Sequence, residues 1–118
     1  MVVRQHPRFH ASFSGTLTHR NQRHAISRSL DLSRKGCRVQ SSFPAFAGMK
    51  VDLQLIFPGS RNPILIQGAV VRWAGAHGIG IEFLSLATPD ERQLEGTLRL
   101  LAAKTTHSSP QVPVGGRA

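Results

Sequence analysis

The chain is poor in the residues on which disulfide frameworks and membrane spans depend. It has one cysteine, no tyrosine, one tryptophan and only six acidic residues among 118. The single cysteine, Cys37, excludes an internal disulfide framework. No segment approaches the run of roughly 20 apolar residues that spans a bilayer, and the first residues lack the apolar core of a secretory signal. We therefore expect a cytoplasmic protein that does not insert into a membrane.

The sequence also lacks the motifs of common catalytic and metal sites. It contains no Cys-x-x-Cys, His-Glu-x-x-His, Gly-x-Ser-x-Gly or phosphate-cradling Walker loop. Only His6 and His10 stand four residues apart, and Pro7 between them disfavours the helix that would bring both to one metal. The few acidic residues show no pair spaced for acid–base catalysis. We therefore expect no enzymatic activity, no metal and no cofactor.

Positive charge is what the chain has in excess. Fifteen Lys and Arg against six Asp and Glu give a formal net charge of +9, and twelve of the cations are arginines. Arginine favours planar, forked recognition of phosphates and purine edges. The composition therefore indicates an anionic partner, such as a nucleotide, a nucleic acid or an anionic membrane surface. Solubility and codon bias alone would also produce it.

A two-residue period of apolar positions predicts β-structure. Within residues 51–57 the apolar side chains occupy every second position and share one strand face. Similar patterns recur in residues 9–17, 26–33 and 79–83, and residues 63–73 form a longer apolar stretch with β-branched residues. Turn-forming residues separate these segments. About six short strands with hairpin-length connections predict an all-β fold, either an antiparallel barrel or a sandwich.

One helix is predicted after the strands. Residues 88–91, Thr-Pro-Asp-Glu, have the pattern of a capping box with proline at the first helical position. Leu94, Leu98 and Leu101 follow at helical spacing, and Leu100 is expected to broaden this apolar stripe. We expect the helix to pack its leucines on the sheet.

Two arginines precede the first predicted strand. Arg4 and Arg8 are four residues apart, and Pro7 favours an extended segment in which both guanidiniums lie on one side. Alone this pair is a weak signal, because an arginine-rich chain produces such spacing by chance, as Arg34 and Arg38 do again. A solvated basic terminus is the alternative interpretation.

A second pattern combines Asp31, Ser33 and Gly36. Leu30 and Leu32 are expected to share one strand face, which places Asp31 and Ser33 together on the opposite, polar face. A carboxylate suits the adjacent N1–H and amino donors of guanine. The serine hydroxyl can bind a phosphate or fix a turn, and the glycine allows a positive φ or a close approach of backbone to ligand. The alternative is a bend in which Asp31 and Ser33 cap their own backbone.

Taken together, the two motifs resemble the PilZ domain family, a bacterial receptor module for the second messenger cyclic di-GMP. That family has an Arg-x-x-x-Arg motif before its first strand and an Asp/Asn-x-Ser-x-x-Gly motif later. Residues 70–73 (Val-Val-Arg-Trp) and 78–83 also resemble its closing hairpin. A C-terminal helix follows in both, so the resemblance covers about residues 3 to 103.

The resemblance implies a six-stranded antiparallel PilZ-type β-barrel with a C-terminal α-helix packed against it. It also implies that cyclic di-GMP binds on the outer surface. The binding residues that it implies are Arg4, Arg8, Asp31, Ser33 and Gly36. The arginines would clamp guanine edges and phosphates, and Asp31 and Ser33 would hold a guanine and the neighbouring phosphate. The organisation would be a ligand-binding segment at 1–8, the barrel and helix at 9–103 and a disordered tail at 104–118.

The predicted function is that of a receptor and adaptor that relays cyclic di-GMP to a partner protein. Its arginine segment, mobile without an anion because of its like charges, would become ordered on the ligand. One alternative is a PilZ-like protein-interaction module that binds no ligand. A barrel that binds RNA or single-stranded DNA would need exposed aromatics, and the chain has no tyrosine. We therefore expect no nucleic-acid polymer as a partner.

Overall fold

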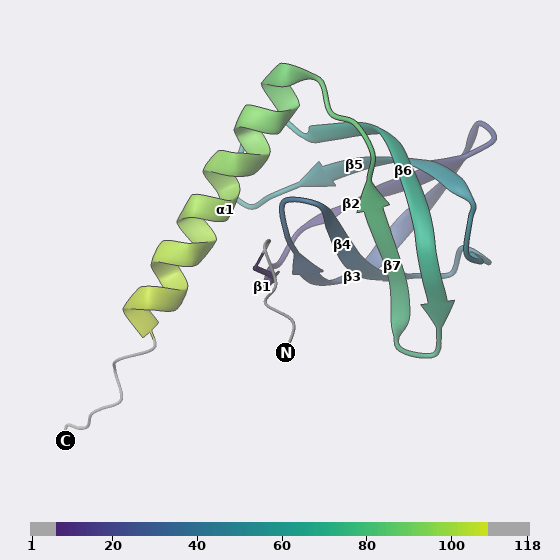
Figure 1. The fold of residues 1–118 in the computed structure, drawn as a ribbon, viewed down its shortest axis with the longest axis horizontal. Helices are drawn as coiled ribbons and strands as arrows, with labels where there is room; N and C mark the ends of the chain where they lie inside the picture. The colour runs from purple at the N-terminus through teal and green to yellow at the C-terminus, as the bar shows by residue number, and fades with distance from the viewer. Residues whose placement is uncertain (1–6, 109–118) are drawn as a thin grey trace.

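The structure is a computed structural model, which describes residues 7–108 (Figure 1). These residues form seven β-strands followed by one helix. The elements are β1 (Phe9–His10), β2 (Ser14–His19), β3 (Gln22–Leu32), β4 (Gly36–Ser41), β5 (Lys50–Ile56), β6 (Ile64–Gly75), β7 (Gly78–Phe83) and α1 (Thr88–Ser108).

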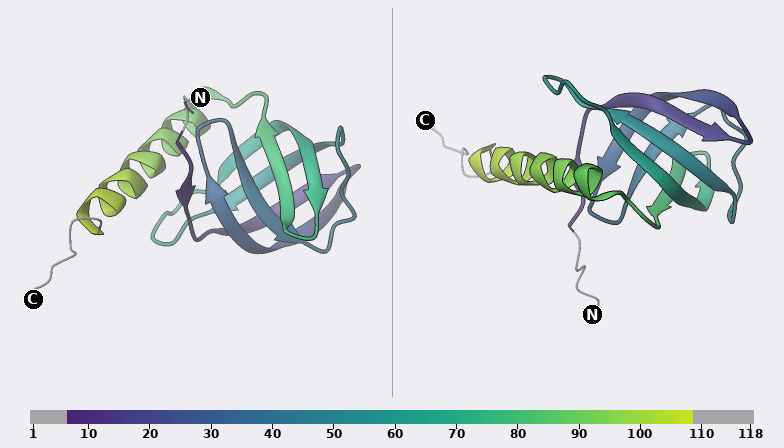
Figure 2. Two further views of the ribbon diagram at one scale, coloured as in Figure 1. Left: turned by 60° about the horizontal axis from the view of Figure 1, so that its bottom comes forward. Right: turned by 90° about the horizontal axis from the view of Figure 1, so that it is seen from above.

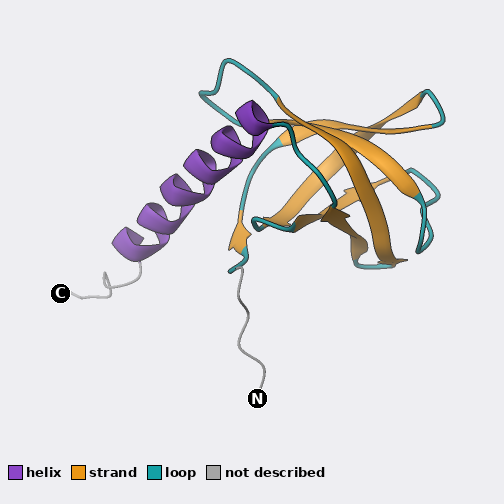
Figure 3. Ribbon diagram, turned by 45° about the horizontal axis from the view of Figure 1, so that its top comes forward, coloured by secondary structure: helices purple, strands orange, loops and turns teal. Residues whose placement is uncertain are grey.

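The strands form one antiparallel sheet that closes on itself. Its order is β1-β3-β2-β5-β6-β7-β4, and β3 also pairs with β4, so that β2 to β7 complete a ring (Figure 3). The short strand β1 is an addition to this ring, because it pairs only with the end of β3. The predicted six-stranded antiparallel barrel is therefore confirmed.

Apolar side chains from alternating strand positions fill the barrel. In β5 the buried residues are Val51, Leu53 and Leu55, as the two-residue period predicted. The largest fully buried side chains are Leu17, Leu32, Cys37, Val39, Leu55, Ile64, Ile66, Val71 and Leu94. Most come from the strands, so the core lies inside the barrel and extends to the base of the helix.

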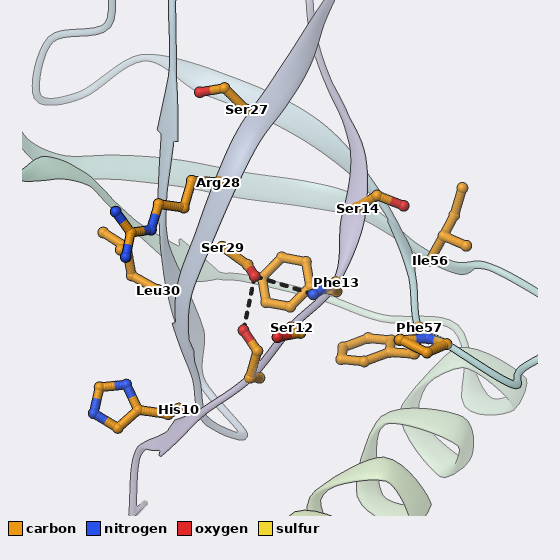
Figure 4. A pocket seen from close by; sticks show the side chains of 12 residues that line it. His10, Ser12, Phe13, Ser14, Ser27, Arg28, Ser29, Leu30, Ile56 and Phe57 are labelled. Atoms are coloured by element: carbon orange, nitrogen blue, oxygen red, sulfur yellow. Dashed lines mark hydrogen bonds between the residues drawn. The ribbon is translucent and has the colours of Figure 1, made fainter.

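A polar side chain interrupts the pairing of the first residues with β3. The hydroxyl of Ser29 accepts a hydrogen bond from the backbone N–H of Phe13 (3.0 Å) and donates one to the carbonyl of Ala11 (2.7 Å). These two bonds, drawn in Figure 4, take the place of ladder bonds to β3 in the segment that joins β1 to β2. The apolar spacing of residues 9–17 therefore continues across two short strands instead of one.

Strand β3 also departs from simple alternation. Its pairing with β4 shifts between Ile26 and Arg28 and again between Ser29 and Asp31, as it does at β-bulges. Leu32 is fully buried, whereas Leu30 is partly exposed and lies outside the core cluster. The prediction that these two leucines share one face was wrong, because the extra residue at the second irregularity breaks the period of two.

Helix α1 is attached to the barrel at its N-terminal end. The carboxylate of Asp90 accepts a hydrogen bond from the backbone N–H of Leu65 (2.9 Å), which joins the first helical turn to β6. Leu94 is buried in the core, and Leu98 and Leu101 pack against it. Leu100 is 67% exposed, because 100° per residue places it roughly 120° from Leu94 around the helix axis. The prediction that Leu100 joins the apolar stripe was wrong.

The helix continues beyond its predicted end. It runs to Ser108, so residues 104–108, assigned to the tail on sequence, are helical, and residues 109–118 lie outside the described residues. Figure 2 shows that its C-terminal part projects away from the barrel. No helix among the described residues is long and apolar enough to cross a membrane.

Candidate functional site

The pairing of β1 with β3 brings residues of the two sequence motifs together. Phe9 lies opposite Leu32 and His10 opposite Asp31, so Arg8 emerges beside the end of β3. Nη1 of Arg8 is 2.6 Å from Oδ1 of Asp31, although the two residues are 23 positions apart. The Arg8 side chain is 37% exposed and that of Asp31 12%. Arg8 is thus held by an ion pair, and Arg4 lies outside the described residues.

A second arginine, which sequence reasoning did not select, binds the same carboxylate. Arg38 lies opposite Asp31 in the β3–β4 ladder, and its Nη2 is 3.2 Å from Oδ2 of Asp31. Each oxygen of Asp31 therefore has its own arginine. In the sequence Arg38 had appeared only as half of a chance repeat with Arg34. Its position between the apolar residues Cys37 and Val39 indicated an outward direction, but its partner depends on the register.

Ser33 and Gly36 form the turn between β3 and β4. The backbone N–H of Ser33 donates to the carbonyl of Gly36 (2.8 Å), and the serine hydroxyl accepts from the backbone N–H of Lys35 (3.2 Å). Ser33 is almost fully buried, and its hydroxyl also lies 3.3 Å from the Gly36 carbonyl. The hydroxyl therefore fixes the turn, and its role toward a phosphate stays a prediction.

Position 36 requires a glycine, because β4 and β7 approach each other too closely there for a side chain. A Cβ at this position would collide with the carbonyl oxygen of Ile81 in β7. The close contact is thus between β4 and β7, which pair through Gly36 and Glu82. The glycine allows β4 to begin against β7 immediately after the turn, and so sets where Asp31 and Arg38 meet.

Beneath the charged residues lies an apolar layer. Cys37 and Val39 are fully buried on the inner face of β4. Burial, and to a smaller extent the charge of Asp31, raise the pKa of the Cys37 thiol from 9.0 to about 12, against an opposing effect of Arg8. The thiol is therefore protonated and unreactive at neutral pH.

The turn that carries Ser33 is also joined to the helix. Nη2 of Arg34 is 2.8 Å from Oε2 of Glu95 in α1. Beside this ion pair, Phe9 and Leu98 line a shallow surface pocket. The segment around Arg8, the turn and the helix thus meet at one end of the barrel.

The larger pocket drawn in Figure 4 lies elsewhere. It has a volume of about 660 Å³ and opens beside Ser29, where the segment between β1 and β2 leaves the ladder with β3. Its lining includes His10, Ser12 and Arg28 but none of the residues predicted to bind the ligand. Of the predicted residues, Arg8 and Asp31 lie instead at the outer surface of the sheet, and Ser33 and Gly36 are buried in the turn beside them. Among residues 7–108, no three His, Cys, Asp or Glu side chains gather to hold a metal ion.

Comparison with known proteins identifies the fold. The model of the PilZ domain family matches residues 3–100. A solved structure of the PilZ domain with c-di-GMP of YcgR from Escherichia coli is similar, with a TM-score of 0.66 and 17% sequence identity. The match covers 92% of this chain and 98% of that one, and at this identity it establishes a common fold. No match was found among curated proteins. PilZ domains are non-catalytic receptors that typically bind cyclic di-GMP. This agrees with the expectation from the sequence that the chain has no enzymatic activity.

Proposed function

Because the chain belongs to the PilZ domain family, we propose that it is a receptor for cyclic di-GMP that passes the signal to a partner protein. The observation that supports this most directly is the ion pair between Arg8 and Asp31, one residue from each motif. It means that the two motifs, separated in the sequence, meet at one place on the barrel surface, where one small ligand can reach both.

The chemistry of the pair fits a guanine nucleotide. The two oxygens of Asp31 can accept the N1–H and amino hydrogens of a guanine edge. Arg8, released from Asp31, then binds a phosphate oxygen or stacks on a base. In this proposal Arg4 supplies a second guanidinium. Ser33 and Gly36 contribute by fixing the turn and strand that hold Asp31 in place.

The signal is relayed by the segment that contains Arg4 and Arg8. When a dianionic ligand replaces Asp31 as the partner of Arg8, this segment becomes ordered on the ligand, beside the turn and α1. A partner protein in the bacterial cytoplasm reads the resulting surface. The proximity of Phe9 to Leu98 and of Arg34 to Glu95 supports this, because the same segment and turn already meet the helix.

A second function accounts for the same ion pairs. Each oxygen of Asp31 is already paired with an arginine of the chain itself, as would be expected in a PilZ-like module that binds no nucleotide and only contacts other proteins. The two functions differ in whether these arginines exchange partners.

Isothermal titration of cyclic di-GMP into the full chain tests the proposal. We expect saturable binding to the wild type, no measurable binding to Arg8→Ala and none of GTP to the wild type. Arg23→Ala is the matched control, because Arg23 is an exposed arginine at the other end of β3, and it should bind like the wild type. A folded wild type that gives no binding heat would favour the protein-interaction module.

Hydrogen exchange tests the relay separately. Saturation with cyclic di-GMP should slow amide exchange in residues 2–10, because the ligand orders this segment. The turn between β2 and β3, at the other end of β3 from Asp31, serves as an internal reference. Unchanged exchange in residues 2–10 at full saturation would exclude this relay without excluding binding.

A further inference from the structure

Arg38 belongs to a row of residues on the outer surface of the barrel. The register places Asp31 opposite Arg38, Arg38 opposite Gly80, and Gly80 opposite Trp73. Directly opposed residues in an antiparallel ladder share a face. The row therefore crosses β3, β4, β7 and β6 in that order, and Figure 1 shows these strands side by side.

The guanidinium of Arg38 has bonding capacity to spare. Its Nη2 is paired with Asp31, but among the described residues its Nε is a buried donor without a hydrogen-bond partner. The side chain as a whole is 38% exposed. A guanidinium has five N–H donors arranged as a fork that matches the oxygens of a phosphate. Arg38 thus combines a fixed position with a guanidinium that solvent reaches in part and whose buried Nε has no partner among the described residues.

The positions on β7 beside Arg38 carry no side chain of their own. They are Gly80 and Gly78, and a Cβ at Gly78 would lie 3.1 Å from Cδ1 of Leu30 and 3.7 Å from Cγ of Arg38. The indole of Trp73 covers Gly80, so closely that a Cβ there would collide with it. Between Arg38 and this indole the surface therefore carries no projecting side chain from β7.

The charges around Asp31 favour a second phosphate-binding arginine. A guanine that binds both oxygens of Asp31 competes with Arg8 and Arg38 for the same acceptors, and a guanidinium that loses its partner is costly. The two guanidiniums then equal in number the two phosphodiesters of cyclic di-GMP. Resting on the proposed function, we infer that Arg38 is a third ligand-binding arginine, which binds a phosphodiester when guanine occupies Asp31.

A double-mutant cycle separates this role from mere positioning of Asp31. Affinity for cyclic di-GMP is measured by titration for the wild type, Arg38→Gln, Asp31→Asn and the double variant, with Arg23→Gln as control. A lost charged hydrogen bond should weaken binding about tenfold or more. A similar factor is expected in the Asp31→Asn background, because Arg38 then acts on the ligand itself. If the effect disappears in that background, or is absent throughout, the inference is wrong.

A second measurement does not depend on any change at Asp31. Arg38→Lys keeps the charge but not the fork, so the ³¹P resonance of bound cyclic di-GMP should differ between this variant and the wild type. Identical resonances would overturn the inference. Thermal unfolding and the fluorescence of Trp73, the only tryptophan of the chain, verify that each variant is folded.

The outcomes distinguish this inference from the function on which it rests. A wild type that does not bind cyclic di-GMP overturns both. A wild type that binds, with binding lost in Arg8→Ala but unchanged in Arg38→Gln, leaves the receptor intact and overturns only the role of Arg38.

Discussion

The two faces of β3 and β4 are built on different principles. On the inner face Leu32, Cys37 and Val39 are fully buried and apolar. On the outer face, one residue away, Asp31 and Arg38 form an ion pair that solvent reaches. The inner face is stabilised by the volume and apolar area that it buries, whereas the outer face depends on which charges the register brings together. Changes to the first should alter stability, and changes to the second should alter binding.

The largest expected effect comes from the inner face. Leu32→Ala should lower the free energy of unfolding by about 2–5 kcal/mol, because it removes apolar contacts and leaves a cavity. Leu100→Ala is the matched control, since this leucine is 67% exposed and its truncation should cost less than about 0.5 kcal/mol. Urea unfolding of both variants provides the comparison. Equal losses would show that Leu32 is not part of the core.

High pH should weaken the same face through Cys37. Because burial raises its pKa from 9.0 to about 12, the thiol loses its proton in the unfolded chain before it does so in the folded one. This contribution to stability is complete below pH 9 and is lost as the pH rises toward 12, by at most about 1.4 kcal/mol per pH unit. Unfolding midpoints of the wild type and Cys37→Ala at about pH 7.5 and about pH 10.5, on either side of the unfolded-state pKa, measure it. An equally large loss in the variant would contradict this prediction.

Gly36 connects the two faces, because it lets β4 approach β7. Gly36→Ala should cost about 1–3 kcal/mol, since the new methyl group forces the two backbones apart. Gly75→Ala provides the control, because no atom lies within 4 Å of a Cβ at that position. If thermal unfolding showed the two variants to be equally stable, the close approach would not limit this position.

The smallest effect is expected for the ion pair between Arg34 and Glu95. Both side chains are partly exposed, at 54% and 34%, so the coupling between Arg34→Gln and Glu95→Gln should be below about 1 kcal/mol. Denaturant unfolding of the two single variants and the double variant measures this coupling. A much larger value would mean that the helix depends on this contact for its attachment.

The sequence predicted the inner face better than the outer one. The two-residue period identified the buried residues of β5, because burial acts on each strand position separately. It failed for Leu30, because the irregular pairing after Ser29 cannot be read from apolar spacing. The helix prediction failed for Leu100, because this residue lies roughly 120° from Leu94 around the helix axis and therefore outside the apolar stripe.

The candidate site was predictable only in part. Its two motifs indicated Arg8 and Asp31, and the structure pairs them. Arg38 was not selected, because its importance arises from the β3–β4 register, a property of two segments together. Ser33 illustrates the opposite case. Its hydroxyl suits a phosphate and a turn equally well; the positions of Lys35 and Gly36 show that it fixes the turn, and its role toward a phosphate stays a prediction.

Because the C-terminal part of α1 projects from the barrel, a small rotation of the helix moves its far end. The helix is held near its start by Asp90, then by Glu95 and by the packing of Leu98 and Leu101, and it continues to Ser108. With a rise of 1.5 Å per residue, the stretch beyond Leu101 is about 10 Å long. A rotation of about 10° around Leu101 would therefore displace the far end by about 2 Å. Any adjustment at the turn next to Asp31 is thus magnified at a distance where a second protein can meet it without touching the barrel.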